Sequence, residues 1–354
     1  MSGSGTSSEP VFPLSALDYE LPPDRIAQYP VEPRDHARLL VVERSTGRFA
    51  DQHVYDLPWW LRSGDLLVLN DTKVIPARLL GRREATRGKW EGLFLKQLPD
   101  GRWELMAQTR GSPKPGEWVA LDQGGVRLHL TEKTAEGHWL ARPDPLEPAE
   151  VLLERCGHTP LPPYIRKGRA GPADRQRYQT VYARQAGSVA APTAGMHFTP
   201  QLLDRLEAAG VRRTFVTLHV GVGTFQPIQS DDVTRHVMHC EWCEITQSAV
   251  DAIQRCRQEG GRIVAVGTTS VRVLETAARL DPLRPWRGET DLYIYPPFEF
   301  RLVDALMTNF HLPRSSLLAL VAAFMGLEQM HAAYRHAIAA GYRFYSYGDA
   351  MLIL

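Results

Sequence analysis

The sequence has few cysteines, no long hydrophobic run and almost no net charge, and each absence removes a class of protein. Four cysteines in 354 residues, with no apolar signal segment at the start, exclude a disulfide framework and indicate a reducing cytoplasm. The longest apolar run, residues 317–325, is shorter than the ~20 residues of a membrane span and predicts a buried helix. With 41 Lys plus Arg against 40 Asp plus Glu, a formal charge of +1 does not demand a polyanionic partner.

What remains is the composition of a globular protein. At 44% apolar content, 354 residues can bury one large core or two domains. The opening Ser/Gly/Thr run predicts a flexible tail over residues 1–16. From about residue 79 the chain alternates in short segments between turn sequences, the pattern of a small antiparallel barrel. We expect an α/β main domain with a β-sheet core, residues 17–78 and 151–354, and an inserted all-β, barrel-like domain at 79–150.

Residues 189–225 place polar side chains, glycines and two histidines in sequence that otherwise resembles core. Thr199 as N-cap, Pro200 at the first helical position and Gly210 beyond the end predict a short helix. His197 comes just before this helix, at an element boundary. The second histidine comes after the strand that follows.

That strand alternates between two faces, and His219 ends it on the half-polar face. Gly221 and Gly223 follow, but Pro227 comes too soon for a helix, so the dinucleotide-binding fingerprint fails. The glycines instead allow the backbone to pass close to a ligand or a neighbouring loop. A single histidine here is more often a structural side chain. Two of them, flanked by Thr193 and the glycines, predict the rim of a pocket.

Polar residues also follow other apolar strands. Asp71 and Lys73 belong to an Asn-Asp-Thr-Lys cluster after the strand at 65–69, where open sheets commonly bind ligands. A turn in which Asp71 caps its own backbone is an equal alternative. His311 precedes the buried helix, and Asp349 precedes the final strand, so both lie where an α/β protein builds a ligand site.

A helix predicted at 249–259, capped by Ser248, leads into a strand at 263–266 that turns into another helix through hydroxyl residues. Free backbone N–H groups and the dipole at such a helix start favour a carboxylate or a phosphate. The predicted contacts are Thr268, Thr269, Ser270 and Arg272. A plain N-cap would explain one of the three hydroxyls.

Basic side chains alternate with tyrosines in residues 160–182, which suits a nucleic-acid backbone with bases to stack. A proline-braced surface loop is the alternative. The predicted RNA contacts are Lys73, Arg78, Tyr164, Arg166, Lys167 and Arg169. Residues 236–243 contain two histidines and two cysteines but lack the second, distant ligand pair of a structural zinc site, so we expect no metal.

Eight short motifs, in order from about Asp18 to the C-terminus, resemble the S-adenosylmethionine:tRNA ribosyltransferase-isomerase family of the queuosine pathway. They are Ile26-Ala-Gln-Tyr-Pro, Asn70-Asp-Thr-Lys-Val-Ile-Pro-Ala-Arg, Pro162-Pro-Tyr-Ile, Ala191-Pro-Thr-Ala-Gly-Met-His-Phe-Thr, Thr217-Leu-His-Val-Gly-Val-Gly-Thr-Phe, Gly267-Thr-Thr-Ser-Val-Arg, Thr308-Asn-Phe-His-Leu-Pro and Tyr345-Ser-Tyr-Gly-Asp-Ala-Met. The family pattern usually has no cysteine at Cys240 and Cys243, which argues further against zinc.

The resemblance implies an enzyme that transfers and isomerises the ribosyl part of S-adenosylmethionine. The acceptor would be the aminomethyl group of 7-aminomethyl-7-deazaguanine at the wobble position of tRNA with a GUN anticodon. Epoxyqueuosine-tRNA would form, and adenine and methionine would leave. S-adenosylmethionine would be a co-substrate, with no prosthetic group, and the protein a cytoplasmic monomer that binds no membrane.

This chemistry needs two proton transfers and a site for a carboxylate. The sulfonium acidifies the neighbouring 5′ carbon, so a general base would form an ylide and an acid would help adenine leave. Histidines titrate near neutrality, and the candidates are His197, His219 and His311. Asp71 and Asp349 would orient a histidine or the ribose hydroxyls. The S-adenosylmethionine site would comprise Thr193, Gly221, Gly223, Thr268, Thr269, Ser270 and Arg272, with the last four on the methionine carboxylate.

Two other functions stay open, a noncatalytic tRNA-binding protein and an S-adenosylmethionine-dependent RNA methyltransferase. A binding protein would not need the concentration of His, Asp and Thr at strand ends. A methyltransferase would release S-adenosylhomocysteine, whereas ribosyl transfer releases free adenine.

Overall fold

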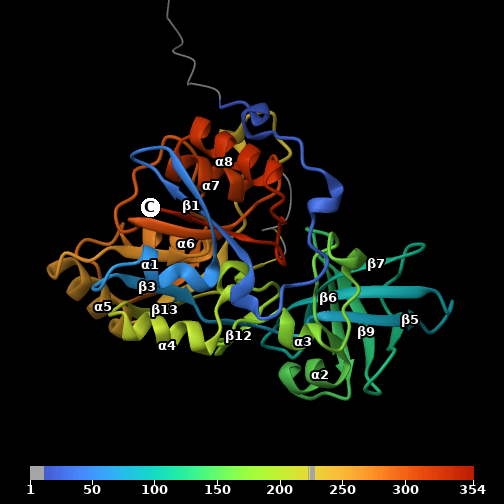
Figure 1. The fold of residues 1–354 in the computed structure, drawn as a ribbon. Coiled ribbons are helices and arrows are strands. Elements are labelled where there is room, and N and C mark those ends of the chain that lie inside the picture. The colour runs from blue at the N-terminus through green and yellow to red at the C-terminus, as the bar shows by residue number, and fades with distance from the viewer. Residues whose placement is uncertain (1–11, 222, 224–227) are drawn as a thin grey trace, which may run out of the picture. The chain divides into compact units, whose positions relative to one another are not determined.

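The computed structural model describes residues 12–221, 223 and 228–354, which divide into two compact units (Figure 1). The first comprises the described residues up to Thr72 together with Thr180–Arg184 and Pro192–Leu354. The second comprises Lys73–Gln179 and Gln185–Ala191. This second unit is wider than the predicted insert, and the domain boundaries stay a prediction. Most of the predicted tail lies outside the described residues.

The first unit is built on a mixed sheet of nine described strands in the order β16-β14-β13-β3-β15-β17-β18-β1-β2. The strands are β1 (Arg38–Glu43), β2 (Arg48–His53), β3 (Leu66–Asn70), β13 (Arg212–Leu218), β14 (Glu241–Ile245), β15 (Ile263–Val266), β16 (Trp286–Thr290), β17 (Ala305–Asn309) and β18 (Ala350–Ile353). The central strands β13, β3, β15 and β17 are parallel. Their carboxyl ends therefore meet at one edge of the sheet.

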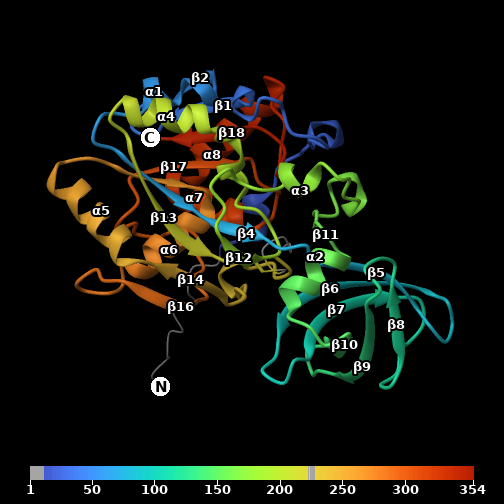
Figure 2. The ribbon, with the colours of Figure 1, turned by 90° about the horizontal axis from the view of Figure 1, so that it is seen from below.

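Helices cover both faces of this sheet. They are α1 (Leu57–Trp60), α4 (Pro200–Ala208), α5 (Gln247–Gln258), α6 (Thr268–Ala277), α7 (Ser316–Met325) and α8 (Leu327–Ala339). Figure 2 shows α1 and α4 on one face and α5 and α6 on the other. Leu202 and Leu206 of α4 pack in one buried cluster with Leu67 and Leu69 of β3. The central strands are apolar on both faces because both faces are covered.

The predicted helix punctuation is confirmed in one helix and wrong in another. Thr199 Oγ1 accepts the Leu202 N–H at 3.1 Å and Pro200 begins α4, as predicted. In α5 the N-cap is Thr246, whose hydroxyl accepts the Ala249 N–H, and not Ser248. Both residues could cap by type, but Ser248 already lies inside the helix, while Thr246 has the extended backbone of a cap. The buried helix predicted at 317–325 is α7.

A closed six-stranded antiparallel barrel forms the core of the second unit. Its strands are β5 (Arg78–Arg83), β6 (Lys89–Gln97), β7 (Trp103–Thr109), β8 (Trp118–Leu121), β9 (Arg127–Lys133) and β10 (Trp139–Asp144), and β8 pairs with β5 to close it. Alternate residues point inward, so Trp103, Leu105, Leu128 and Leu130 are fully buried. The α/β sheet and the small all-β barrel confirm the predicted fold class.

Shorter elements complete both units. The second also contains α2 (Ala149–Cys156), α3 (Asp174–Arg177), β11 (Gly157–His158), β12 (Gln185–Ser188) and η5 (Arg166–Gly168), and β4 (Thr72–Val74) spans its first residues. The 3₁₀ helices of the first unit are η1 (Leu14–Leu17), η2 (Pro23–Arg25), η3 (Arg34–His36), η4 (Val54–Asp56), η6 (Thr193–His197) and η8 (Val233–Arg235).

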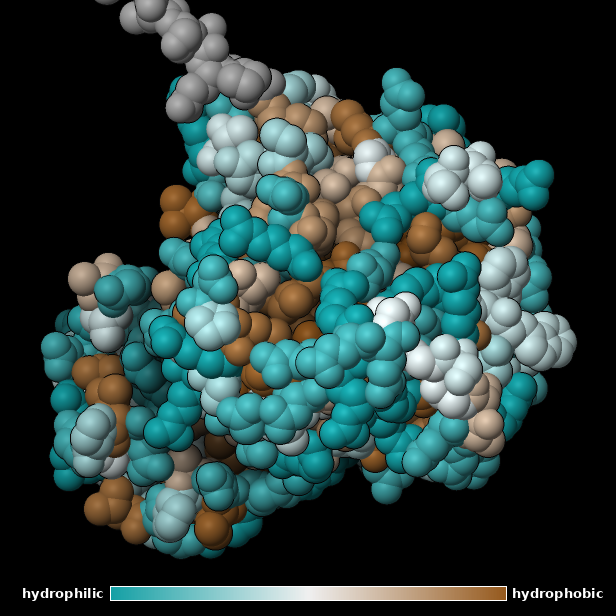
Figure 3. Space-filling model, turned by 90° about the vertical axis from the view of Figure 1, so that its left-hand side faces the viewer, coloured by the Kyte–Doolittle hydropathy of each residue, from teal (hydrophilic) through white to brown (hydrophobic). Residues whose placement is uncertain are grey.

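Hydrophilic residues cover most of the face drawn in Figure 3, with hydrophobic residues scattered among them. In the part of the chain that the structure describes, no single helix is long and apolar enough to cross a membrane. Helices α7 and α8 reach that length only as a pair, which is bent by 112°.

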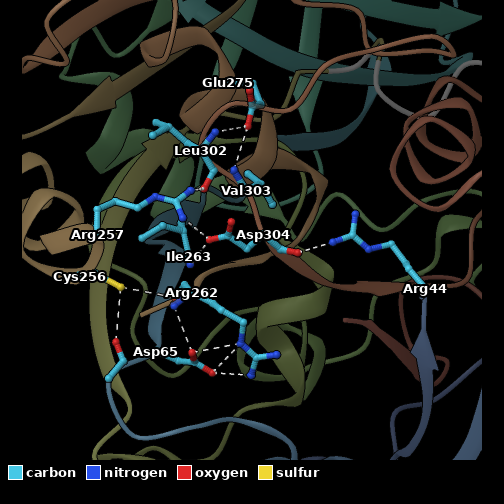
Figure 4. Close-up of polar contacts among 11 residues, drawn as sticks. Arg44, Asp65, Cys256, Arg257, Arg262, Ile263, Glu275, Leu302, Val303 and Asp304 are labelled. Carbon is cyan, nitrogen blue, oxygen red and sulfur yellow. Dashed lines mark hydrogen bonds and ion pairs between the residues drawn. The ribbon is translucent and has the colours of Figure 1, made fainter. Parts of the chain in front are cut away.

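Acidic side chains tie together the amino ends of the parallel strands (Figure 4). Asp65 pairs with Arg262 at 2.6 Å and accepts the Arg62 N–H at 2.8 Å. Asp304 accepts the Ile263 N–H at 2.7 Å. Glu275 of α6, only 2% exposed, accepts N–H groups from three consecutive residues, 301–303, at 2.9 to 3.0 Å.

We predict that Glu275→Ala lowers the free energy of unfolding by roughly 2–5 kcal/mol, because three backbone N–H groups lose their acceptor. Urea unfolding measures the change. Glu207→Ala is the matched control: this glutamate is 69% exposed in an ion pair with Arg213, and its loss should cost less than about 1 kcal/mol. Equal losses in the two variants would contradict the anchoring role of Glu275.

Candidate active site

The carboxyl edge of the parallel strands collects most of the predicted catalytic residues. Asp71 follows β3, His219 follows β13, Thr268 follows β15 after one glycine, and His311 follows β17. Because these strands are parallel, their polar ends lie side by side, which is where open α/β sheets bind ligands.

His219 is the half-buried histidine of the site. Its Nδ1 lies 2.8 Å from Thr72 Oγ1, and its ring stacks on Trp242 with centroids 4.9 Å apart and planes 18° apart. Burial lowers its pKa, although the charge of Asp71 opposes this. Its Nε2 has no hydrogen-bond partner among the described residues. If Nδ1 donates to Thr72, Nε2 keeps a lone pair and can accept a proton.

Asp71 is buried, and its carboxylate contacts other residues than the histidines. Oδ1 accepts the Thr217 hydroxyl at 2.7 Å, and Oδ2 accepts from the Arg184 guanidinium at 2.9 and 3.1 Å. Its effect on His219 is therefore through charge. Its role in orienting a histidine or a ribose stays a prediction.

Asn70, which sequence reasoning did not assign to the site, connects three elements. Its amide nitrogen donates to the Leu218 carbonyl at 3.0 Å and to Thr269 Oγ1 at 3.1 Å. Its amide oxygen accepts the N–H groups of Thr72 and Leu218, both at 3.1 Å. The sequence did contain a sign of this role: Asn70 is a polar residue at the end of a strand whose other residues are all apolar.

Asn309, the last residue of β17, was also missed. Its Oδ1 accepts the Thr193 hydroxyl at 2.8 Å, and its amide nitrogen lies 3.2 Å from His197 Nε2. Because the amide donates, Nε2 accepts and the imidazole is neutral. Burial, with Arg343 and Arg34 nearby, lowers the pKa of His197 to about 4. These contacts join two predicted residues, Thr193 and His197, but they occupy the histidine lone pair.

His311 is 8% exposed and its Nε2 lies 2.7 Å from Thr308 Oγ1. Burial lowers its pKa to about 3, so it is neutral at physiological pH. Its backbone N–H donates to Tyr334 Oη at 3.0 Å, and Tyr19 donates to its carbonyl. The catalytic role of this histidine stays a prediction.

Asp349 binds backbone rather than a histidine. Its Oδ1 accepts the Arg38 N–H at 3.1 Å, and its Oδ2 accepts the Arg343 N–H at 2.7 Å. These bonds fix the chain before β18. They favour a structural role, and the predicted catalytic role remains untested.

Arg272 is turned into the protein. Each of its guanidinium nitrogens has an internal partner: the carbonyls of Leu292 and Thr290, at 3.0 and 3.1 Å, and the carboxylate of Glu241. The other oxygen of Glu241 accepts the Gly221 N–H at 2.8 Å. Arg272 therefore supports the loop after His219. Its predicted role as a carboxylate ligand stays a prediction that these contacts do not favour.

The start of α6 differs from a plain capped helix. Its N-cap is Gly267, with φ +88°, so none of the three following hydroxyl residues is the cap. Thr269 Oγ1 accepts from Asn70, and Ser270 donates to the Val266 carbonyl at 2.8 Å. Thr268 is buried beside them. The anion role of this helix start stays a prediction.

Two glycines follow β13. A Cβ at Gly223 would meet the ring of the exposed His239, so either glycine or a shift of that ring is needed there, whereas a Cβ at Gly221 would make only ordinary contacts. The sequence that follows, including Pro227, lies outside the described residues. Among the residues that are described, no group of three or more His, Cys, Asp or Glu side chains is placed to hold a metal ion.

The predicted RNA-binding residues lie in the second unit and divide into two sets. Arg78 pairs with Glu91, and Arg166 pairs with Asp174, both at 2.6 Å. The exposed cations are Lys73, Lys167 and Arg169, and Tyr164 is half-buried. Their contact with RNA stays a prediction.

The first prediction from this site concerns the buried pair of Glu241 and Arg272, each 4% exposed. Glu241→Gln and Arg272→Met should each cost roughly 3–5 kcal/mol of unfolding free energy, because each leaves a buried group uncompensated. The double variant should cost clearly less than the sum. A double-mutant cycle by urea unfolding measures this, and strict additivity would contradict the pairing.

The free energy of unfolding should depend on pH through His197. His197 is harder to protonate when folded, so it stabilises the fold above about pH 6.5, and this contribution is lost as the pH falls towards 4. The shift corresponds to about 3 kcal/mol. His197→Gln should flatten the pH dependence of unfolding in that window. An unchanged slope in the first variant would contradict burial of a neutral His197.

Comparison with known proteins places these motifs in a family. Residues 14–353 match the model of the queuosine biosynthesis protein family. The chain is 51% identical over 342 residues to S-adenosylmethionine:tRNA ribosyltransferase-isomerase of Symbiobacterium thermophilum, covering 96% of this chain and 99% of the relative. The protein of the same name from Acidithiobacillus ferrooxidans is 52% identical over 338 residues, with 95% and 96% covered.

The crystal structure of S-adenosylmethionine tRNA ribosyltransferase from Thermotoga maritima is similar to this fold. It has a TM-score of 0.57 and 39% identity, and the match covers 96% of this chain and 100% of that one. The resemblance inferred from the eight motifs is thereby confirmed: the chain belongs to the queuosine biosynthesis protein family.

Proposed function

We propose that this chain joins the ribosyl part of S-adenosylmethionine to the aminomethyl group of 7-aminomethyl-7-deazaguanine in tRNA, at the wobble position of a GUN anticodon. The enzyme class is that of its relatives, a ribosyltransferase-isomerase of queuosine biosynthesis. We further propose that it acts as a monomer in the cytoplasm, with S-adenosylmethionine as co-substrate and no prosthetic group.

One observation carries the mechanism: of the three candidate histidines, His219 is the most exposed, and its Nε2 has no hydrogen-bond partner among the residues that the structure describes. The lone pair of His197 is used by Asn309, and His311 is enclosed. A proton-transfer group must reach its substrate and must be able to take up charge. His219, held at Nδ1 by Thr72, meets both requirements.

The reaction then follows from the chemistry of the sulfonium. His219 takes a proton from the 5′ carbon of the ribosyl group, and the electron pair left on that carbon forms the ylide. As the ribosyl group rearranges, its bond to adenine breaks and adenine leaves with the proton that His219 returns. The bond between the 5′ carbon and sulfur breaks with its electron pair on sulfur, so methionine leaves as a neutral thioether. The aminomethyl nitrogen of the tRNA base forms the new bond to the ribosyl group and loses one proton to solvent.

The rest of the edge would hold the co-substrate. Thr193 and Asn309 are hydrogen-bonded to each other at 2.8 Å, and the first turn of α6 lies at the end of the neighbouring strand β15. Hydroxyls, an amide and a helix start suit ribose hydroxyls and a carboxylate. The exposed cations Lys73, Lys167 and Arg169 would contact phosphates of the RNA.

The names of the relatives support ribosyl transfer rather than the two alternatives, a methyltransferase or a binding protein without activity. Product analysis separates all three. Adenine and methionine released in equal amounts, and only with tRNA carrying the aminomethyl-deazaguanine base, would support the proposal. S-adenosylhomocysteine, or tight tRNA binding without turnover, would overturn it.

We predict that His219→Ala lowers kcat by about 10²–10⁴-fold, because general acid–base catalysis contributes a factor of this size. The wild-type kcat should fall with pH only below the usual titration range of histidine, since burial lowers the pKa of His219 and only the neutral imidazole accepts a proton. Adenine release at saturating substrate measures both effects.

His197→Ala and His311→Ala serve as comparisons, with circular dichroism to verify folding. Under this assignment they affect turnover less than His219→Ala does. Near-normal turnover in folded His219→Ala would sink the assignment. If His197→Ala were also near normal, only His311 of the three candidates would remain as the base.

A further inference from the structure

We propose that Trp242, stacked on His219, is the platform on which the tRNA base to be modified stacks. The inference rests on the proposed function and adds a subsite to it. It assigns a residue that the eight sequence motifs do not contain.

The pairing of β13 with β14 builds this platform. Leu218 lies opposite Cys243, so the next pair across the two chains is His219 and Trp242, on the same face. The His219 N–H donates to the Trp242 carbonyl at 2.9 Å, which fixes both backbones. The two rings then stack at 4.9 Å and 18°. The platform is therefore held rigidly by a strand pair.

Part of the Trp242 side chain is exposed in the described structure. Trp242 is 36% exposed, and within the described residues its one ring contact is His219. Tryptophans that serve as core in this protein are covered: Trp90, Trp103 and Trp139 are 4% exposed or less. A rigid, half-open indole beside the catalytic candidate suits a planar ring, because aromatic side chains stack unpaired RNA bases.

The position of Trp242 favours the tRNA base over the adenine of S-adenosylmethionine. Trp242 lies on β14, which is antiparallel to β13 and lies outside the four parallel strands. The groups that suit a small polar co-substrate lie at the inner strands: Asn309 ends β17, Thr193 of η6 is bonded to it, and Thr269 lies in the first turn of α6 after β15. A base that enters from a macromolecule reaches the outer residues first.

Support for the platform comes from the buried pair behind it. Glu241 precedes Trp242, and its carboxylate joins Arg272 to the Gly221 N–H. Both the strand that carries Trp242 and the loop after His219 are thus tied to α6. This arrangement keeps the two rings nearly parallel, with planes 18° apart.

The test measures the Kd for tRNA and the Kd for S-adenosylmethionine in separate experiments. Trp242→Ala should raise the Kd for tRNA carrying the aminomethyl-deazaguanine base, measured without S-adenosylmethionine, by roughly 5- to 150-fold, the range for loss of one stacked base. The Kd for S-adenosylmethionine alone, measured by calorimetry, should change less than about 2-fold. Trp242→Phe should recover most of the tRNA affinity because it restores an aromatic face.

Trp59→Ala is the matched control, since Trp59 is 78% exposed on α1 and is not part of the site. It should leave both constants unchanged. A tRNA that is abasic at the wobble position has no base to stack there. It should bind wild type and Trp242→Ala with equal Kd. Because Trp242 also holds His219, the substitution is repeated in a His219→Ala background, where the loss of tRNA affinity should persist.

The outcomes separate this inference from the proposed function. If wild type releases no adenine, the proposed function fails whatever Trp242 does. If wild type is active but Trp242→Ala weakens S-adenosylmethionine and not tRNA, the platform holds the co-substrate and this inference is overturned. Unchanged affinity for both, or a loss that disappears in the His219→Ala background, overturns it as well.

Discussion

The side-chain amide of Asn70 is the constraint on which the site depends. It uses both its donors and its acceptor oxygen within the protein, on Leu218, Thr269 and Thr72. Each buried polar group left without a partner would lower the stability of the fold by about 1–3 kcal/mol. The three elements that Asn70 joins are therefore held in one arrangement. Thr72 in turn contacts His219. The position of the proposed base thus follows from one buried side chain at the end of β3.

The amino and carboxyl ends of the parallel strands differ in the role of their polar side chains. At the amino edge, Asp65, Asp304 and Glu275 bond to backbone N–H groups and arginines, and these contacts stabilise the fold. At the carboxyl edge, hydroxyls and amides are also bonded, but in the described part of the chain His219 is half-buried and Trp242 is exposed. A protein can tolerate such incompletely satisfied groups where the rest of the sheet is firmly held.

Local sequence patterns predicted the features of the fold that depend only on residues close together in the chain. The cap and proline of α4, the buried strand of β15 and the alternating strands of the barrel follow from residues within one element. What the sequence could not show are pairs distant along the chain. Asn309 reaches His197 across 112 positions, and Asn70 reaches Thr269 across 199. The same holds for Arg272. An arginine at a helix start predicts an anion ligand, but the strand order places Glu241 beside it, and the guanidinium binds that carboxylate.

Burial explains why three similar histidines serve different purposes. A buried imidazole is kept neutral because the protein interior disfavours its charged form, and this lowers the pKa of His197 to about 4 and of His311 to about 3. Such a side chain is a stable hydrogen-bonding partner and a poor acceptor of a proton. His219 is shifted in the same direction, but Asp71 offsets part of the effect. A residue that must gain and lose a proton in each cycle therefore belongs at the half-open end of the strand, where its partner Trp242 also meets solvent.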